Sequence, residues 1–108
     1  MIYEYRVYEP HPGKMDALHA RFRDHTLKLF EKHGIKNVGY WTADGDEYSN
    51  RLIYLLGFED TGHWERAWAA FGSDPEWLRV VEESEADGPL VARVFNTLLT
   101  PTDYSPAL

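Results

Sequence analysis

The sequence has 108 residues and a mass of 12.6 kDa, which predicts one domain over residues 1–108 with a C-terminal tail over residues 100–108. Hydrophobic residues make up 44% and charged residues 27%, a composition that excludes intrinsic disorder. The net charge of −7 disfavours nucleic acid and anionic membranes as partners, and the absence of cysteine excludes disulfides and thiolate chemistry.

The first residues show no basic region followed by an apolar run, and no apolar stretch approaches the ~20 residues of a membrane span. We therefore expect a soluble protein in the cytoplasm, without a membrane partner. Aromatic residues make up 15% of the chain, more than a core of this size obviously needs.

Residues 2–9 are rich in β-branched and aromatic types and predict a strand that ends at the Pro10–Gly13 turn. In a strand, Tyr5 and Val7 share one face, and Glu4 and Arg6 share the other. If the first pair faces the helices, Glu4 and Arg6 form an ion pair that faces a dimer partner and helps to fix the register of the dimer.

The apolar period changes to that of a helix over residues 14–33. Its stripe contains Met15, Leu18, Phe22, His25 and Leu29, and Gly34 stands where a left-handed residue ends a helix. We therefore expect His25 to face the sheet.

The remaining elements alternate between the two periods. Two strands are predicted over 36–42 and 51–58, joined by a polar loop, and Asp60 or Thr61 can cap a helix over 61–71. Ser73 and Glu76 have capping-box spacing at the start of a further helix that extends to about residue 86. A last strand covers 90–99, and the two prolines of the tail keep it out of the sheet centre.

This order of strand, helix, two strands, helix pair and strand is typical of the ferredoxin-like α+β fold, a four-stranded antiparallel sheet with helices on one face. The other sheet face would expose Tyr, Trp, Leu and Ile side chains to water. A bare apolar sheet face is more often an interface than a free surface, so we expect a homodimer that packs sheet to sheet.

Several segments together resemble the NIPSNAP family over essentially the whole chain. They are the opening Ile2–Tyr8 with Pro12–Lys14, then Phe22–Gly34, Val38–Trp41, Trp68–Phe71 with Asp74–Trp77, and the closing 100–106. The resemblance implies a dimeric α+β barrel, in which two ferredoxin-like subunits pack their sheets together, and it implies no settled activity. Many relatives carry an acidic residue before the position of Asn96, where this chain has Phe95.

His25 is the candidate acid or base, because a neutral imidazole exchanges protons near pH 7 and the residue matches a histidine of the family pattern. The alternative is a core histidine with one hydrogen-bond partner. We expect no metal site. His25 and His33 lack the one-turn spacing of a helical zinc pair, and the acidic loop 44–47 indicates a solvated hairpin.

Aromatic and polar side chains could line a pocket between the helices and the sheet, although aromatic residues at helical spacing are usually core. The candidate lining residues are Tyr5, Phe22, Tyr40, Trp41, Tyr54, Trp64, Trp68, Trp77 and Asn96.

The leading hypothesis is a homodimer that binds a small, largely apolar organic molecule. By analogy with related barrel proteins, it would carry out cofactor-free monooxygenase or isomerase chemistry. The alternative is a non-catalytic carrier or interaction module, and heme binding is a third option. The glycines are isolated and form no nucleotide fingerprint, so we expect no cofactor.

Overall fold

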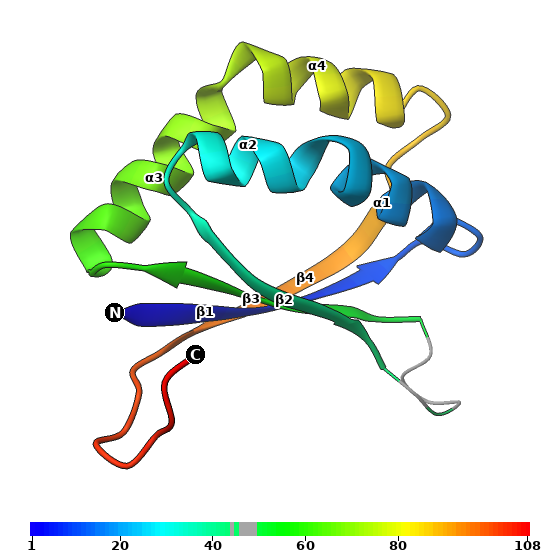
Figure 1. Ribbon diagram of the computed structural model, residues 1–108. Coiled ribbons are helices and arrows are strands. Elements are labelled where there is room, and N and C mark those ends of the chain that lie inside the picture. Colours follow the sequence, from blue (N-terminus) through cyan, green and yellow to red (C-terminus); the bar gives the residue numbers. More distant parts are fainter. Residues whose placement is uncertain (44, 46–49) are drawn as a thin grey trace.

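The computed structural model describes residues 1–43, 45 and 50–108 (Figure 1). The predicted acidic hairpin at 44–47 lies, apart from Gly45, outside the described residues. The elements in chain order are β1 (Ile2–Pro10), α1 (Met15–Arg21), η1 (Phe22–Thr26), α2 (Leu27–Lys32), β2 (Lys36–Thr42), β3 (Leu52–Phe58), α3 (Thr61–Ser73), α4 (Pro75–Ser84) and β4 (Val91–Leu99).

The four strands form one sheet in the order β2-β3-β1-β4, and every neighbouring pair is antiparallel. The helices lie together on one face of this sheet, and the other face carries no helix in the part of the chain that is described (Figure 1). This arrangement confirms the predicted ferredoxin-like α+β fold.

The core lies between the sheet and the helices. Its largest fully buried members include Tyr54, Leu56 and Phe58 of β3, Leu18 of α1 and Phe30 of α2. The alternating side chains of β3 therefore supply the sheet side of the core, because successive residues of a strand point to opposite faces. Each large apolar side chain buried in this way contributes about 1.5–3 kcal/mol.

The strand register assigns the faces of β1. Glu4 lies opposite Leu56 of β3, and Arg6 lies opposite Tyr54, so Glu4 and Arg6 share the face of the core residues. Tyr5 and Val7 point to the helix-free face. The condition stated for β1 is therefore not met, and the charged pair faces the helices and not a dimer partner.

The helix predicted over 14–33 contains a π-helical turn, η1, between α1 and α2. The backbone N–H of Leu27 donates to the carbonyl of Phe22, five residues back, and the Thr26 hydroxyl donates to the carbonyl of Arg21 at 3.2 Å. A π turn holds one more residue than an α turn. The extra residue rotates the stripe, so Thr26 is buried in the position that α-helical spacing predicts for His25.

Asp74 connects the end of α2 to the start of α4. Its Oδ1 accepts the Glu76 backbone N–H at 2.9 Å, so Asp74 caps α4 in place of the predicted Ser73. Its Oδ2 accepts Lys32 Nζ at 2.8 Å and lies 2.7 Å from His33 Nε2. The hydrogen bonds from Lys32, His33 and the Glu76 N–H hold the pKa of the Asp74 carboxyl well below its usual range.

We expect the Asp74→Asn variant to unfold at a lower temperature than the wild type at neutral pH, by an amount that shrinks in acid. A depressed pKa in the folded state adds stability above the unfolded pKa of about 3.9, and this stability is lost as the pH falls toward the folded value. Thermal scans from pH 7 to pH 3 test this, with the exposed Asp87→Asn as control. A difference in melting temperature that stays constant to pH 3 would contradict the assignment.

Candidate functional site

The carboxylate of Glu4 is completely buried between the sheet and the helices. Its Oε1 accepts the indole N–H groups of Trp64 at 3.1 Å and Trp68 at 2.7 Å. Its Oε2 accepts Arg6 Nη1 at 3.0 Å and the side-chain amide of Asn96 at 2.9 Å. Buried charges are stable only when they are paired and hydrogen-bonded, and these four donors meet both conditions.

Arg6 extends this network toward the middle of the sheet. Its Nε donates to the Tyr54 hydroxyl at 2.8 Å and its Nη2 to the Tyr8 hydroxyl at 3.3 Å, while its guanidinium carbon lies 4.5 Å from the Trp68 ring centre. Burial alone would lower the pKa of Arg6. The Tyr54 and Tyr8 hydroxyls and the Glu4 carboxylate outweigh this effect and raise the pKa above its usual value, so the guanidinium stays charged.

Four separate elements supply these groups, namely β1, α3, β4 and, with Tyr54, β3. Strand alternation places Glu4 and Arg6 on one face of β1, and α3 presents Trp64 and Trp68 one turn apart, at i and i+4. Asn96 lies opposite Arg6 in the register of β4 with β1. The cluster of Glu4, Arg6, Tyr8, Tyr54, Trp64, Trp68 and Asn96 is named the Glu4–Arg6 cluster from here on.

A group of stacked rings adjoins the cluster on the side of β2. Tyr40 stacks on Tyr54 with ring centres 5.0 Å apart, and Phe22 lies within 5.5 Å of both rings. Burial raises the pKa values of the Tyr40 and Tyr54 hydroxyls well above the usual value. Both hydroxyls are therefore neutral at physiological pH and can donate or accept hydrogen bonds but cannot serve as bases.

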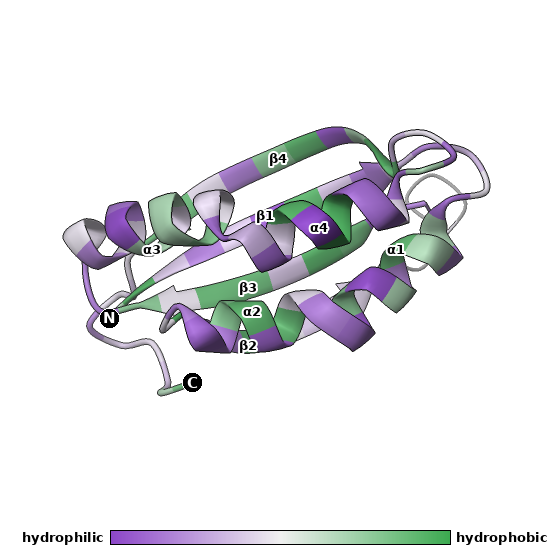
Figure 2. Cartoon of the chain, turned by 90° about the horizontal axis from the view of Figure 1, so that it is seen from above, coloured by the Kyte–Doolittle hydropathy of each residue, from purple (hydrophilic) through white to green (hydrophobic). Residues whose placement is uncertain are grey.

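The cluster is open on the side of β4. Val94, Asn96 and Leu98 lie opposite Tyr8, Arg6 and Glu4, so they share the helix side of the sheet. All three are exposed, and Figure 2 shows that β4 lies beyond the edge of the helical layer. An exposed strip on β4, which is apolar at Val94 and Leu98, therefore runs beside the charged pair.

The structure brings four of the predicted pocket residues together in the Glu4–Arg6 cluster: Tyr54, Trp64, Trp68 and Asn96. Phe22 and Tyr40 form the adjoining rings. The expectation for three others was wrong. Tyr5 and Trp41 lie on the helix-free face, in register with Leu55 and Ile53, and Trp77 packs away from the cluster, between Phe71 and Arg21.

His25 is exposed, so its predicted orientation toward the sheet was wrong. The physical reason is the π turn, which turns the residue away from the core. It lines two surface hollows of about 300 and 290 Å³ beside α4, with Asp24 in both. An acid–base role for His25 stays a prediction, and it would have to operate on the outer surface of the helical layer.

The His25→Ala variant is expected to unfold within about 0.5 kcal/mol of the wild type, because exposed side chains outside hydrogen-bond networks contribute little to stability. Urea denaturation at pH 7 measures this difference. Thr26→Ala is the matched comparison, because Thr26 is buried and caps a freed carbonyl. A loss above 1 kcal/mol for His25→Ala would show that the imidazole has a structural partner.

Sequence reasoning recognised Glu4 and Arg6 as a pair but did not assign them to the pocket. A signal was nevertheless present. Trp64 and Trp68, one turn apart, bring two indole N–H donors to one helix face, and buried donors need acceptors. Glu4, which stands between two tyrosines in the first strand, was an available acceptor.

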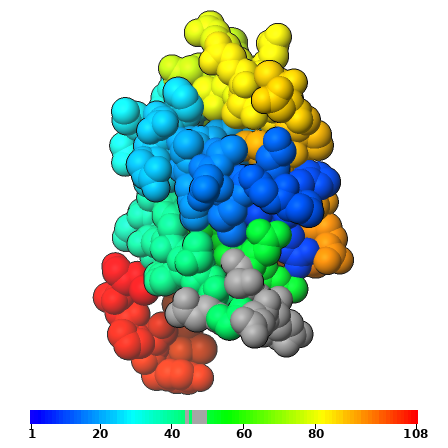
Figure 3. All heavy atoms as spheres, turned by 90° about the vertical axis from the view of Figure 1, so that its right-hand side faces the viewer, coloured from blue at the N-terminus to red at the C-terminus, as the bar shows by residue number. Residues whose placement is uncertain are grey.

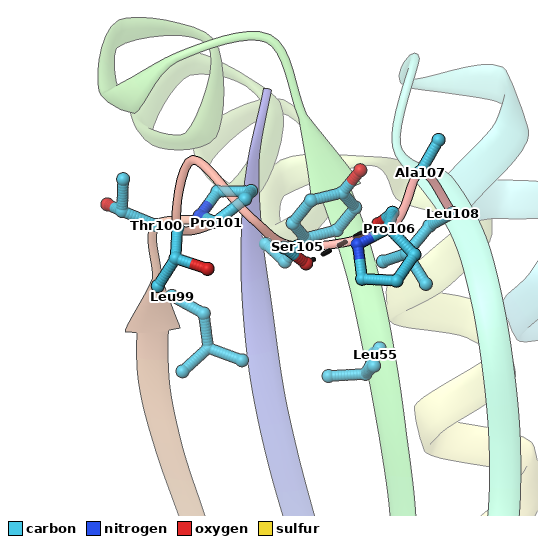
Figure 4. Close-up of a pocket in the computed structure, with 10 residues that line it drawn as sticks. Leu55, Leu99, Thr100, Pro101, Ser105, Pro106, Ala107 and Leu108 are labelled. Carbon is cyan, nitrogen blue, oxygen red and sulfur yellow. Dashed lines mark hydrogen bonds between the residues drawn. The ribbon is translucent and has the colours of Figure 1, made fainter.

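Residues 100–108 lie on the side of the sheet opposite the helices (Figure 3), and a second concavity lies between this tail and the helix-free face (Figure 4). Its volume is about 440 Å³. It is lined by Tyr3, Leu55 and Leu99 of the sheet and by Thr100, Pro101, Thr102, Ser105, Pro106, Ala107 and Leu108 of the tail.

Within residues 1–43, 45 and 50–108, no group of three histidine or acidic side chains is arranged to hold a metal ion. In the same residues, no helix has the length and apolar character needed to cross a membrane.

The sheet order, the single helical layer and the buried pair on β1 define an α+β protein of the ferredoxin-like class. The chain belongs to the NIPSNAP family, whose model matches residues 3–106. The resemblance found in the sequence is thereby confirmed. No curated protein is similar enough to the chain to count as a match.

Solved structures of similar proteins support the fold. An uncharacterized NIPSNAP-like domain protein from Burkholderia xenovorans has 27% identity and a TM-score of 0.85, over 99% of this chain and 90% of that chain. A NIPSNAP family protein from Agrobacterium tumefaciens has 22% identity and a TM-score of 0.85, over 97% and 96%. A protein from Nitrosomonas europaea with a proposed role as an antibiotic biosynthesis monooxygenase has 13% identity and a TM-score of 0.64, over 94% and 98%.

Proposed function

We propose that the chain binds a small, largely apolar organic molecule on the helix side of β4, with an oxygen atom of the ligand on Arg6. The observation that carries this proposal is the hydrogen bonding of the guanidinium. Bonds to Tyr54, Glu4 and Tyr8 use three of its five N–H groups, and the described residues provide no hydrogen-bond partner for the other two. The rigid pair therefore offers a fixed donor beside an exposed apolar strip.

The charge of the cluster narrows the class of ligand. Arg6 is already neutralised by Glu4, and the Tyr54 hydroxyl is neutral, so the cluster has no excess positive charge for a strongly anionic ligand. The surrounding indole and phenol rings favour a flat apolar body. A neutral aromatic compound with a carbonyl or phenolic oxygen fits both conditions.

The same geometry supports one kind of chemistry. A guanidinium at a carbonyl oxygen stabilises the negative charge of the enolate that forms when a proton passes from the neighbouring carbon to solvent water. Glu4 is unsuited to be the base, because four donors already occupy its oxygens. Binding without turnover, as in a carrier, is the alternative function, and it needs the same contact with Arg6.

Three naphthalene probes test the binding site: naphthalene, 2-naphthol and 2-acetylnaphthalene, titrated by calorimetry. We expect the two oxygenated probes to bind more tightly than naphthalene, and Arg6→Met to raise their Kd at least tenfold, because hydrogen bonds to charged groups contribute about 1.5–3 kcal/mol. The exposed Arg23→Met is the control.

A second variant tests the same site independently, in case the Arg6→Met variant does not fold. Val94 is 49% exposed on the strip, so Val94→Trp should fold normally and block the probes by occupying their space. Failure of all three probes to bind the wild type, or unchanged binding in both variants, would overturn the proposal. A Soret shift on addition of hemin would instead favour the heme alternative.

We also propose that the chain forms a homodimer through its helix-free sheet face. The supporting observation is the exposure of large apolar side chains on this face, namely 52% for Trp41, 49% for Phe95 and 38% for Tyr5. Sedimentation velocity at micromolar concentration tests this, and a monomer at all concentrations would overturn it.

A further inference from the structure

The tail at residues 100–108 has a defined shape but weak attachment to its own chain. Its hydrogen bonds are internal, from Ser105 N to the Thr102 carbonyl at 3.1 Å and from Ser105 Oγ to the Pro106 carbonyl at 3.4 Å. In the described residues, no hydrogen bond joins the tail to the body. Pro101 and Pro106 restrict its backbone, so the tail is preorganised without being tied to the sheet.

A gap separates the tail from the sheet face beneath it. The 440 Å³ concavity lies between Leu55 and Leu99 on the sheet and Pro106 and Leu108 on the tail (Figure 4). Protein interiors are close-packed, and a segment that served only to cover its own sheet would fill such a space. The concavity therefore has room for side chains or a ligand from outside the chain.

The largest side chain of the tail is not directed into this concavity. Tyr104 is 83% exposed and does not line it. A small molecule in the concavity would leave Tyr104, Phe95 and Trp41 in water, whereas a protein surface laid over the whole face would cover them. The exposed apolar area is therefore larger than one small ligand can bury.

The distribution of charged side chains favours a second copy of this chain as the protein that covers the helix-free face. Among the residues that the structure describes, the centre of the helix-free face and the lining of the concavity contain no charged side chain. Charged residues on this face stand at its ends, with Lys36 at one end and Glu9 bonded to Arg51 and Arg93 at the other. On a chain of net charge −7, this neutral face is where two copies can meet with the least repulsion.

We propose that residues 101–108 form a clasp that packs on the helix-free face of a second copy, whose side chains fill the concavity. This inference rests on the proposed homodimer and adds a specific role for the tail. Because the clasp acts between chains, it contributes to the dissociation constant of the dimer and not to the stability of the monomer.

A truncated chain that ends at Thr100 tests the clasp by sedimentation velocity over a range of concentrations. We expect the full chain to form dimers, and the truncated chain to fold with the same far-UV spectrum but dimerise with a Kd at least tenfold higher. A truncated chain that dimerises equally well would overturn the clasp and leave the dimer intact. A full chain that stays monomeric would overturn both proposals.

A fluorescent label locates the tail in the dimer. The sequence contains no cysteine, so Tyr104→Cys provides one labelling site for an environment-sensitive naphthalene dye. We expect its emission to shift to the blue as the protein dimerises, whereas the same dye at Glu83→Cys, exposed on α4, should not respond. Emission that is independent of concentration at Tyr104 would contradict the clasp. Nile red that binds monomers and is lost on truncation would show a ligand site in its place.

Discussion

Replacing Glu4 with leucine is expected to cost about 3–5 kcal/mol of unfolding free energy, which is a large part of the stability of a domain of this size. The substitution leaves the Arg6 guanidinium charged and largely buried without its counterion. It also removes the acceptor of the Trp64 and Trp68 indole N–H groups. Guanidinium chloride denaturation at pH 7, followed by far-UV circular dichroism, measures the loss.

The double variant Glu4→Leu/Arg6→Met separates the two causes. It removes both charges, and replacing a whole buried pair with apolar side chains costs much less than breaking it. The two indole donors still lack an acceptor, which costs about 1–3 kcal/mol for each donor that stays buried and unpaired. We therefore expect the double variant to be more stable than Glu4→Leu alone but less stable than the wild type.

Glu65→Leu is the matched control, because Glu65 is an exposed glutamate on the same helix as the two tryptophans. Its unfolding free energy should stay within about 0.5 kcal/mol of the wild type. If the costs of Glu4→Leu and Arg6→Met simply added in the double variant, the two side chains would not be energetically coupled, and the Glu4–Arg6 cluster would not act as a unit.

The order and the approximate limits of the elements could be predicted from local patterns. Lys36–Thr42 agrees with its predicted bounds, Gly34 has the expected positive φ of 74°, and Asp60 caps α3 by accepting the His63 backbone N–H. These features depend on neighbours within a few residues, which is the range over which periodicity and capping act.

The faces of β1 could not be predicted in the same way, because alternation separates two sets of side chains without showing which set is inside. Tyr5 and Val7 resemble a core set, and Glu4 and Arg6 resemble a solvent set. The outcome depends on Tyr54, Trp68 and Asn96, which come from segments far away in the sequence. A satisfied polar network can be buried as well as an apolar stripe can.

The error at His25 has a different origin. The α-helical spacing from Leu18 and Phe22 leads to His25, but one extra residue in the π turn moves Thr26 into that position. Five residues with one shifted hydrogen-bond pattern leave no distinct mark in the apolar period. The same small change removes the leading catalytic candidate from the interior, and Arg6 takes its place as the residue on which the proposed function depends.

The Leu55→Lys variant is expected to dissociate the proposed dimer, with a Kd at least a hundredfold above that of the wild type. Leu55 lies on the helix-free face, in register with Tyr5 on β1 and Gly39 on β2. In a two-fold symmetric interface the substitution enters twice, so each dimer would bury two unpaired ammonium groups. In the monomer the position is only partly buried, and a lysine side chain can extend its charge to water.

Sedimentation equilibrium measures the dissociation constant, and thermal unfolding at low concentration checks that the variant is folded. Leu78→Lys is the control, because Leu78 is 53% exposed on α4, away from the sheet. If the dimer persists in Leu55→Lys, or if it dissociates equally in Leu78→Lys, the interface lies on another surface. Dissociation in Leu55→Lys alone, with far-UV spectrum and melting temperature preserved, would establish that the helix-free face accounts for the aromatic surplus of the sequence.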